Sequence, residues 1–152
     1  MHRAVFGLVA LAASQAAGAT DVNLNALLIS SCTLTLATPG VMTASSTGTV
    51  IGSEQSGGTP ASMTIVSLGV LPTISFAAPS LTAKPGGWTA SHTDEIKFTS
   101  TRGANQAYTN SSSSFVETGL TDTFTVHGRV TSAEGFAAGN YTLTTVVTCS
   151  QL

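Results

Sequence analysis

Polar and apolar residues alternate over a long stretch near the start of the chain. From Val22 to Leu36 the even-numbered positions are apolar or small, and most odd-numbered positions carry Asn, Ser or Thr. A period of two residues is typical of a strand with one buried face. A second alternating stretch, with its apolar residues on odd positions, runs from Tyr141 to Cys149. We therefore expect a first strand over residues 22–36 and a last strand over residues 140–149, each with its apolar face toward the core.

Shorter alternating stretches lie between these two, and Gly, Pro and Ser residues separate them. Over 61–68 the apolar positions change parity, which predicts a β-bulge, and the polar segment 101–114 predicts a loop. The positions expected to point inward in the later strands are Ile74, Phe76, Ile96, Phe98, Phe124, Val126 and Val130. No stretch after residue 19 keeps a helical apolar period. The pattern predicts an all-β fold, a sandwich or barrel of about seven to eight short antiparallel strands.

The first nineteen residues have the pattern of an export signal. A short basic start that contains Arg3 precedes an apolar run, and Ala17-Gly18-Ala19 matches a small-residue cleavage site. The run is shorter than the roughly 20 residues that span a bilayer. We expect a signal peptide over residues 1–19, a mature domain over residues 20–152 and no membrane insertion after cleavage. The alternative is a buried first helix.

Composition narrows the classes of partner. Without Arg3, four Lys and Arg remain against seven Asp and Glu, a formal charge of −3 for the mature chain. Charged residues are only 8% of the sequence, and no basic stripe is present to neutralise phosphates. Nucleic-acid binding is therefore not expected. Abundant Ser, Thr and Gly with little charge suit an exported β-protein, because Thr favours strands and Ser and Gly favour turns.

The chain has two cysteines, Cys32 and Cys149. In an exported chain two cysteines predict one disulfide, and a metal site would need more ligands than these. We expect a Cys32–Cys149 bridge between the first and the last strand; the alternative is two free buried thiols.

Residues that could carry catalysis or bind a metal are sparse. Asp21-x-Asn23-x-Asn25 resembles the start of a calcium loop, but Ala26 and Cys32 stand where that loop needs Gly and Glu. A periplasmic enzyme would need His92, Asp94 and Glu95 to converge in a pocket. His127 alternates with outward-facing neighbours, and no G-x-S-x-G motif occurs. We expect no enzyme activity, no metal and no cofactor.

Two aromatic residues in predicted connections are candidates for ligand binding. Trp88 follows the Pro85-Gly86-Gly87 turn, and Tyr108 lies in the polar segment 101–114. Trp88 is expected mainly to cap one end of the fold. If these two side chains instead faced solvent together, they would form a recognition surface for a glycan or another surface ligand.

Several motifs resemble a known group of exported proteins. The chain carries Ser31-Cys32-Thr33 in its first alternating stretch and Leu71-Pro72-Thr73-Ile74-Ser75-Phe76 in the middle. It continues with Phe124-x-Val126-x-Gly128-x-Val130, then Gly139-x-Tyr141 and a last strand. These features resemble the small fimbrial-subunit-like and spore-coat-U-like secreted proteins of Gram-negative bacteria, over most of residues 20–149.

The resemblance implies a fold, a role and partners. Members of the better understood families are incomplete immunoglobulin-like antiparallel β-sandwiches that polymerise when an alternating segment of one subunit enters the next. Here that donor strand would be Thr20–Ile29, with Val22, Leu24, Ala26 and Leu28 entering the neighbour. The implied partners are like subunits, a periplasmic chaperone and an outer-membrane usher, and the implied destination is the cell surface or the medium. Two features depart from typical pilins: Cys149 lies in the last strand, and the usual penultimate Tyr is missing.

Overall fold

The structure is a computed structural model, and it describes residues 26–27 and 30–151. Every regular element in these residues is a strand, and there are twelve of them. No helix long and apolar enough to cross a membrane occurs among them. The strands are β1 (Ser31–Thr38), β2 (Thr43–Ala44), β3 (Val50–Gly52), β4 (Ala61–Leu68), β5 (Thr73–Phe76), β6 (Ser80–Ala83), β7 (Thr93–Ser100), β8 (Asn105–Thr109), β9 (Ser113–Val116), β10 (Thr121–Thr131), β11 (Thr142–Thr144) and β12 (Val147–Ser150).

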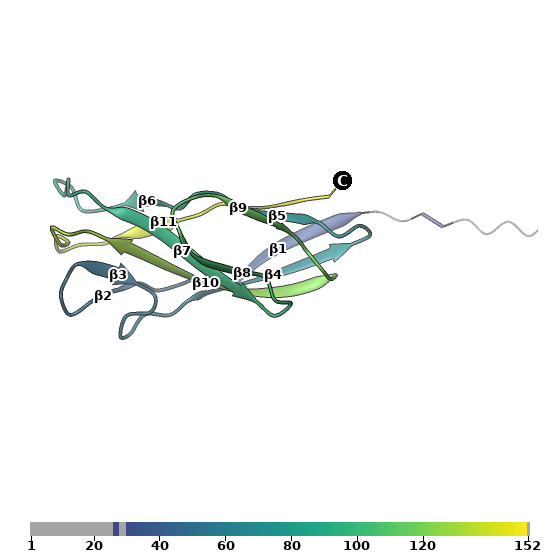
Figure 1. Cartoon of the computed structure of the whole chain (residues 1–152), viewed down its shortest axis with the longest axis horizontal. Helices are drawn as coiled ribbons and strands as arrows, with labels where there is room; N and C mark the ends of the chain where they lie inside the picture. Colours follow the sequence, from purple (N-terminus) through teal and green to yellow (C-terminus); the bar gives the residue numbers. More distant parts are fainter. Residues whose placement is uncertain (1–25, 28–29, 152) are drawn as a thin grey trace, which may run out of the picture.

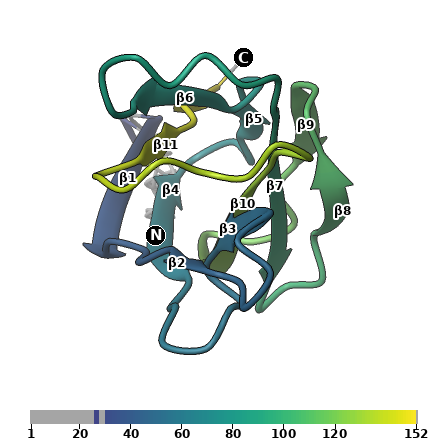
Figure 2. The ribbon, with the colours of Figure 1, turned by 90° about the vertical axis from the view of Figure 1, so that its left-hand side faces the viewer.

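The strands form the two layers of an antiparallel β-sandwich (Figures 1 and 2). In the larger layer the long strand β10 pairs with β4 and then β3 along one edge and with β7 along the other. Strand β1 extends this layer beyond β4, and β8 extends it beyond β7. The second layer contains β12-β5-β9 and the shorter pair β11-β6. The predicted fold class is thus confirmed.

The order of the strands corresponds to that of an immunoglobulin domain. In the constant type, strands A, B, E and D form one sheet, and C, F and G form the other. The sequence β1-β4-β10-β7 matches the first sheet, and the pair β5-β12 matches C and F. Strand β12 is the last strand of the chain. Among the described residues, no strand lies at the G position beside it.

The core lies between the layers and is rich in phenylalanine. Its buried members come from β4, β5, β7 and β10, and are Met63, Ile65, Ile74, Phe76, Ile96, Phe98 and Phe124. The rings of Phe76 and Phe98 stack with their centroids 4.3 Å apart. Aromatic residues bury the largest apolar area per side chain, so this cluster holds the two layers together. The predicted inward positions of β5 and β7 are confirmed, as are those of β10, where Val126 is partly buried.

Strand β1 is shorter than the predicted strand over 22–36. It begins at Ser31, and the described residues Ala26, Leu27 and Ser30 lie outside any strand. Strand β1 begins there because its partner strand β4 ends at the same level. Ser31 pairs with Leu68, the last residue of β4, and Gly69 then turns the chain away with a φ of 86°. Ser30, the described residue just before β1, therefore finds no neighbouring strand in the described part of the sheet.

Two further expectations are wrong. Strand β4 keeps one parity throughout: Ser67 is fully buried, while Val66 and Leu68 are 44% and 55% exposed. The bulge lies instead in β1, between Leu36 and Thr38. The predicted loop 101–114 contains β8 and the start of β9, which pair with β7 and β5. The twelve strands exceed the predicted seven to eight because of β8 and β9, the short strands β2 and β6, and the division of 140–149 into β11 and β12.

Candidate functional site

Two edge strands face each other along one side of the sandwich. Strand β1 is the last strand of its sheet beyond β4, and β12 is the last strand of the other sheet beyond β5. Within residues 30–151 nothing pairs with either outer edge. Unpaired edges present rows of free N–H and C=O groups, which are ready to bind another strand.

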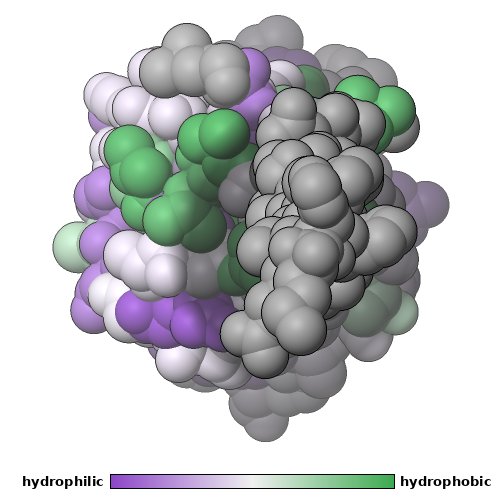
Figure 3. Space-filling view, turned by 90° about the vertical axis from the view of Figure 1, so that its right-hand side faces the viewer, coloured by the Kyte–Doolittle hydropathy of each residue, from purple (hydrophilic) through white to green (hydrophobic). Residues whose placement is uncertain are grey.

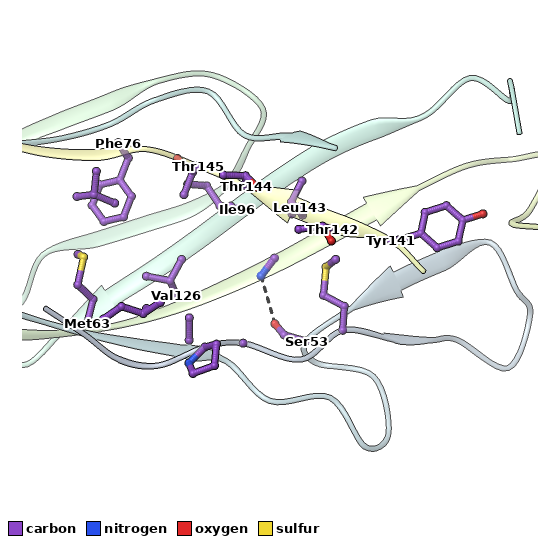
Figure 4. Close-up of a pocket in the computed structure, with 17 residues that line it drawn as sticks. Ser53, Met63, Phe76, Ile96, Val126, Tyr141, Thr142, Leu143, Thr144 and Thr145 are labelled. Atoms are coloured by element: carbon purple, nitrogen blue, oxygen red, sulfur yellow. Dashed lines mark hydrogen bonds between the residues drawn. The ribbon is translucent and has the colours of Figure 1, made fainter. Parts of the chain in front are cut away.

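A groove of about 430 Å³ opens between these edges (Figure 4). Met63 and Val126 line one wall, and Phe76, Leu143 and Thr145 lie on the opposite side. Its lining reaches into the core, since Met63, Phe76 and Ile96 are core residues. The groove therefore reaches the edge of the apolar core along this side, where Met63, Phe76 and Ile96 themselves stay buried.

Leu36 shows most directly that the sandwich is open here. It pairs with Met63, and it lies on the same face of β1 as Cys32 and Leu34. Residues on one face of a strand share their surroundings, yet Leu36 is 63% exposed whereas its partner Met63 is 7% exposed. A large apolar side chain thus points inward and is not covered.

The wall formed by β11 and β12 has the same property. Its odd-numbered positions, which face inward, are all only partly buried: Tyr141, Leu143, Thr145, Val147 and Cys149. The alternation predicted for this segment is confirmed, but in a strand covered on its inner face such positions would be fully buried.

Gly128 shapes the floor of the groove. A Cβ atom at this position would lie 2.8 Å from Cδ2 of Leu143, so the missing side chain lets β11 approach β10. The Ser53 hydroxyl accepts a hydrogen bond from the Gly128 amide at 3.2 Å (Figure 4) and lies 3.1 Å from Nδ1 of His127. Burial lowers the pKa of His127, which favours the neutral ring that can accept the Ser53 proton. In the sequence, the feature that indicates this close approach of two strands is a glycine at an inward position of an alternating strand.

A disulfide joins β1 and β12 beyond the end of the groove that Val147 lines. Cys32 of β1 and Cys149 of β12 form the predicted bridge, with Cα atoms 6.2 Å apart. Beside it, Nε2 of Gln151 donates hydrogen bonds to the carbonyl oxygens of Ser31, Leu68 and Val70. These contacts tie the two walls together at one end, and the groove opens toward Leu36, Met42 and Tyr141 at the other.

Most of the predicted donor strand lies outside the described residues. This applies to Val22, Leu24 and Leu28, and also to the signal peptide 1–19. Ala26 is described and exposed, and Leu27 beside it is 88% exposed. The role of the segment 20–29 stays a prediction.

The two candidate ligand-binding aromatics have separate surroundings. Trp88 is 8% exposed, stacks on Phe136, meets the edge of Tyr141 and donates its indole N–H to the Gly135 carbonyl. Tyr108 lies on the outer face of the larger sheet, where its hydroxyl donates to Glu54 and the Arg129 guanidinium lies 3.9 Å from its ring. Trp88 thus packs against the end of the sandwich, and little of its face is open to a sugar ring.

The residues considered for an enzyme do not converge. Asp94 and Glu95 are neighbours in β7, so their side chains point to opposite faces. Asp94 accepts a hydrogen bond from the Leu81 amide and lies 3.7 Å from His92, whereas Glu95 pairs with Arg129 at 2.7 Å. The described residues contain no group of three or more His, Cys, Asp and Glu that could hold a metal. The absence of enzyme activity stays a prediction.

Two carboxylates are buried near the start of β10. Glu117 and Asp122 are 2% and 1% exposed, and each has one oxygen without a hydrogen-bond partner among the described residues. Burial raises the pKa of Glu117, and the neighbouring Asp122 adds to this effect. Burial also acts to raise the pKa of Asp122, but hydrogen bonds from Ser100, Thr101 and backbone amides outweigh it and lower that pKa.

Glu117→Gln is expected to stabilise the protein at pH 7, because the amide carries no charge that burial would disfavour. An acid whose pKa is raised in the folded state contributes stability below its unfolded pKa, and this contribution is lost as the pH rises through the folded value. The advantage of the variant should therefore shrink between pH 7 and pH 4.5, which urea unfolding at both pH values would measure. The exposed Glu134→Gln is the matched control and should differ little from the parent at either pH. A constant difference for Glu117→Gln would contradict this assignment.

Comparisons with known protein families and with curated proteins find no match to this chain. The disulfide is typical of proteins that fold in an oxidising compartment outside the cytoplasm.

Proposed function

We propose that this protein is a structural, non-enzymatic subunit of a fimbria-like or surface-coat polymer, in which a strand from one subunit completes the sandwich of the next. The observation that carries the proposal is the inward-facing but uncovered Leu36 beside two unpaired strand edges. A strand added between β1 and β12 would satisfy free backbone groups and cover apolar side chains at the same time.

The segment Thr20–Ile29 suits this role by its spacing. Its four alternating side chains, Val22, Leu24, Ala26 and Leu28, would be about 7 Å apart in an extended strand. The wall of β11 and β12 offers four inward positions with the same period, Tyr141, Leu143, Thr145 and Val147. Donor and acceptor therefore have matching repeats.

The shape of the groove suggests the direction of the donor. Because the Cys32–Cys149 bridge joins β1 and β12 beyond the Val147 end of the groove, the free N-terminal tip of a neighbour's arm would enter from the end near Tyr141. Such an arm would run antiparallel to β11 and β12 and parallel to β1. The resemblance to fimbrial subunits adds a periplasmic chaperone and an outer-membrane usher as expected partners, with secretion to the cell surface or medium as the destination.

Deletion of Thr20–Ile29, with residues 1–19 retained for export, is expected to abolish polymers. Wild-type protein should give a ladder of multimers that survives cold SDS and collapses on boiling, whereas the deletion variant should give monomer only. A synthetic peptide of residues 20–29, present at about 100 times its Kd, should stabilise that monomer by about 2.7 kcal/mol, measured as a rise in Tm. A peptide with Leu24→Asp is the control.

Unchanged multimers after the deletion would count against strand exchange. A wild-type protein that runs as a monomer under all conditions would favour the alternative function, a self-complete secreted domain that binds a surface ligand such as a glycan.

A further inference from the structure

A group of apolar side chains lies uncovered at the end of the molecule where β1 begins (Figure 3). We call it the apolar pole, and it consists of Leu68, Val70, Leu71, Val116 and Leu120. Each of these is between 41% and 64% exposed. They are neighbours because the backbone amide of Ser67 donates to the Leu120 carbonyl and the backbone amide of Glu117 donates to the Pro72 carbonyl. Apolar side chains gathered in this way mark an interaction surface.

The apolar pole surrounds the point from which the arm leaves. Ser30 lies against Gly69, the residue between Leu68 and Val70 in the sequence. A Cβ atom built on this glycine would be 2.9 Å from the Ser30 hydroxyl. The three Cα–Cα distances between Leu28 and Ser31 add up to at most about 11 Å, and this limits how far Ser31 can lie from a neighbour's groove that Leu28 enters. The pole of the donor must then lie close to the mouth of the acceptor's groove.

The mouth of the groove carries a hollow of about 480 Å³ at the opposite end of the sandwich. Its lining includes Ala44, Phe136 and Ala138, and it shares Met42 and Tyr141 with the groove itself. Groove and hollow thus form one continuous surface, with room for an arm in the first part and a protruding apolar group in the second.

We infer that the apolar pole of one copy of this chain docks into the hollow at the groove mouth of the next copy, so that each subunit contact combines the arm with a second, head-to-tail interface. This inference rests on the proposed function. The two surfaces differ and lie at opposite ends, so the contact is heterologous and repeats into an open filament rather than a closed dimer.

The test is the rate of polymer growth of the full chain after paired substitutions. Val116→Lys with Leu120→Lys at the pole, and Ala138→Glu at the hollow, should each slow growth about tenfold or more, since burial of a leucine or valine is worth at least that factor. A chain with all three changes should recover most of the rate, because the lysines of one copy face the glutamate of the next. Val146→Lys is the control. Val146 is 59% exposed, like the residues of the apolar pole, but it belongs to neither surface.

Binding of the 20–29 peptide to arm-deleted versions of the same variants separates this inference from the proposed function. We expect peptide binding to be unchanged in all of them, since the substituted residues Val116, Leu120 and Ala138 do not line the groove. Wild-type growth of the pole variants with intact peptide binding would overturn the inference alone. Slower growth without recovery in the triple variant would overturn the assignment of the hollow. If the parent protein itself binds no peptide, the proposed function fails and this inference fails with it.

Discussion

Replacement of Cys32 and Cys149 together by serine is expected to lower the free energy of unfolding by about 4–5 kcal/mol. The bridge joins residues 117 positions apart, so its removal frees a very long loop in the unfolded chain. A domain of this size has a total stability of about 5–15 kcal/mol. The double variant should therefore unfold at much lower urea concentration, which equilibrium unfolding followed by tryptophan fluorescence would measure.

Reduction of the wild-type protein provides the matched control for this prediction, because it breaks the same bond without a change of side chain. The reduced protein and the double variant should unfold at similar midpoints. A loss of less than about 1 kcal/mol in both would mean that the loop is already constrained in the unfolded state.

The disulfide also has a consequence for the groove. Its two walls belong to different sheets, and the described contacts between them gather at the Cys32–Cys149 end, where Gln151 adds hydrogen bonds to Ser31. Without the bridge, no covalent link fixes the distance between the two walls. In the double variant, both the affinity for a donor strand and the free energy of unfolding should therefore fall. A substitution within the groove should lower the affinity and leave the free energy of unfolding nearly unchanged.

The sequence was most informative where a strand has one buried and one exposed face. The inward positions of strand β10 (Thr121–Thr131), which are Phe124, Val126 and Val130, were predicted because its apolar residues alternate. The disulfide followed from the position of both cysteines on inward faces. In these segments the pattern itself records which side chains meet the core.

The pattern failed where polar residues are buried or apolar residues are exposed. In β4 the buried residue is Ser67, whose amide donates to the Leu120 carbonyl, while Val66 and Leu68 face outward. Strands β8 and β9 are rich in Ser, Asn and Gln, and they exist because their neighbours β7 and β5 offer free edges. Tertiary pairing overrides local preference in such places.

The open groove could not be predicted from the sequence for a different reason. Alternation shows that Leu36 points the same way as Cys32 and Leu34, but it does not show whether another strand covers that face. An incomplete sandwich and a complete one can have the same pattern in the strands that they share. Only the strand order reveals that, within residues 30–151, β12 has no partner on its outer edge.

Leu36→Asp is expected to weaken binding of the 20–29 peptide about 100-fold or more, while the stability of the free subunit changes by less than about 0.5 kcal/mol. In the free subunit this side chain is 63% exposed, so a carboxylate there stays hydrated. Once a strand fills the groove, the same carboxylate would be buried among Met63, Val126 and Leu143 with no cation beside it. The cost therefore falls on the complex and not on the fold.

Thr35→Asp is the matched control, because Thr35 is exposed on the opposite face of the same strand. It should leave both peptide affinity and Tm close to those of the parent, and Leu36→Met should retain tight binding because it keeps the apolar contact. Titration calorimetry with the arm-deleted protein would measure all three. If Leu36→Asp bound the peptide as well as the parent does, the donor strand would have to lie elsewhere on the sandwich. If Leu36→Asp instead unfolded, another part of the chain would already cover this face, and the sandwich would be complete without a neighbour.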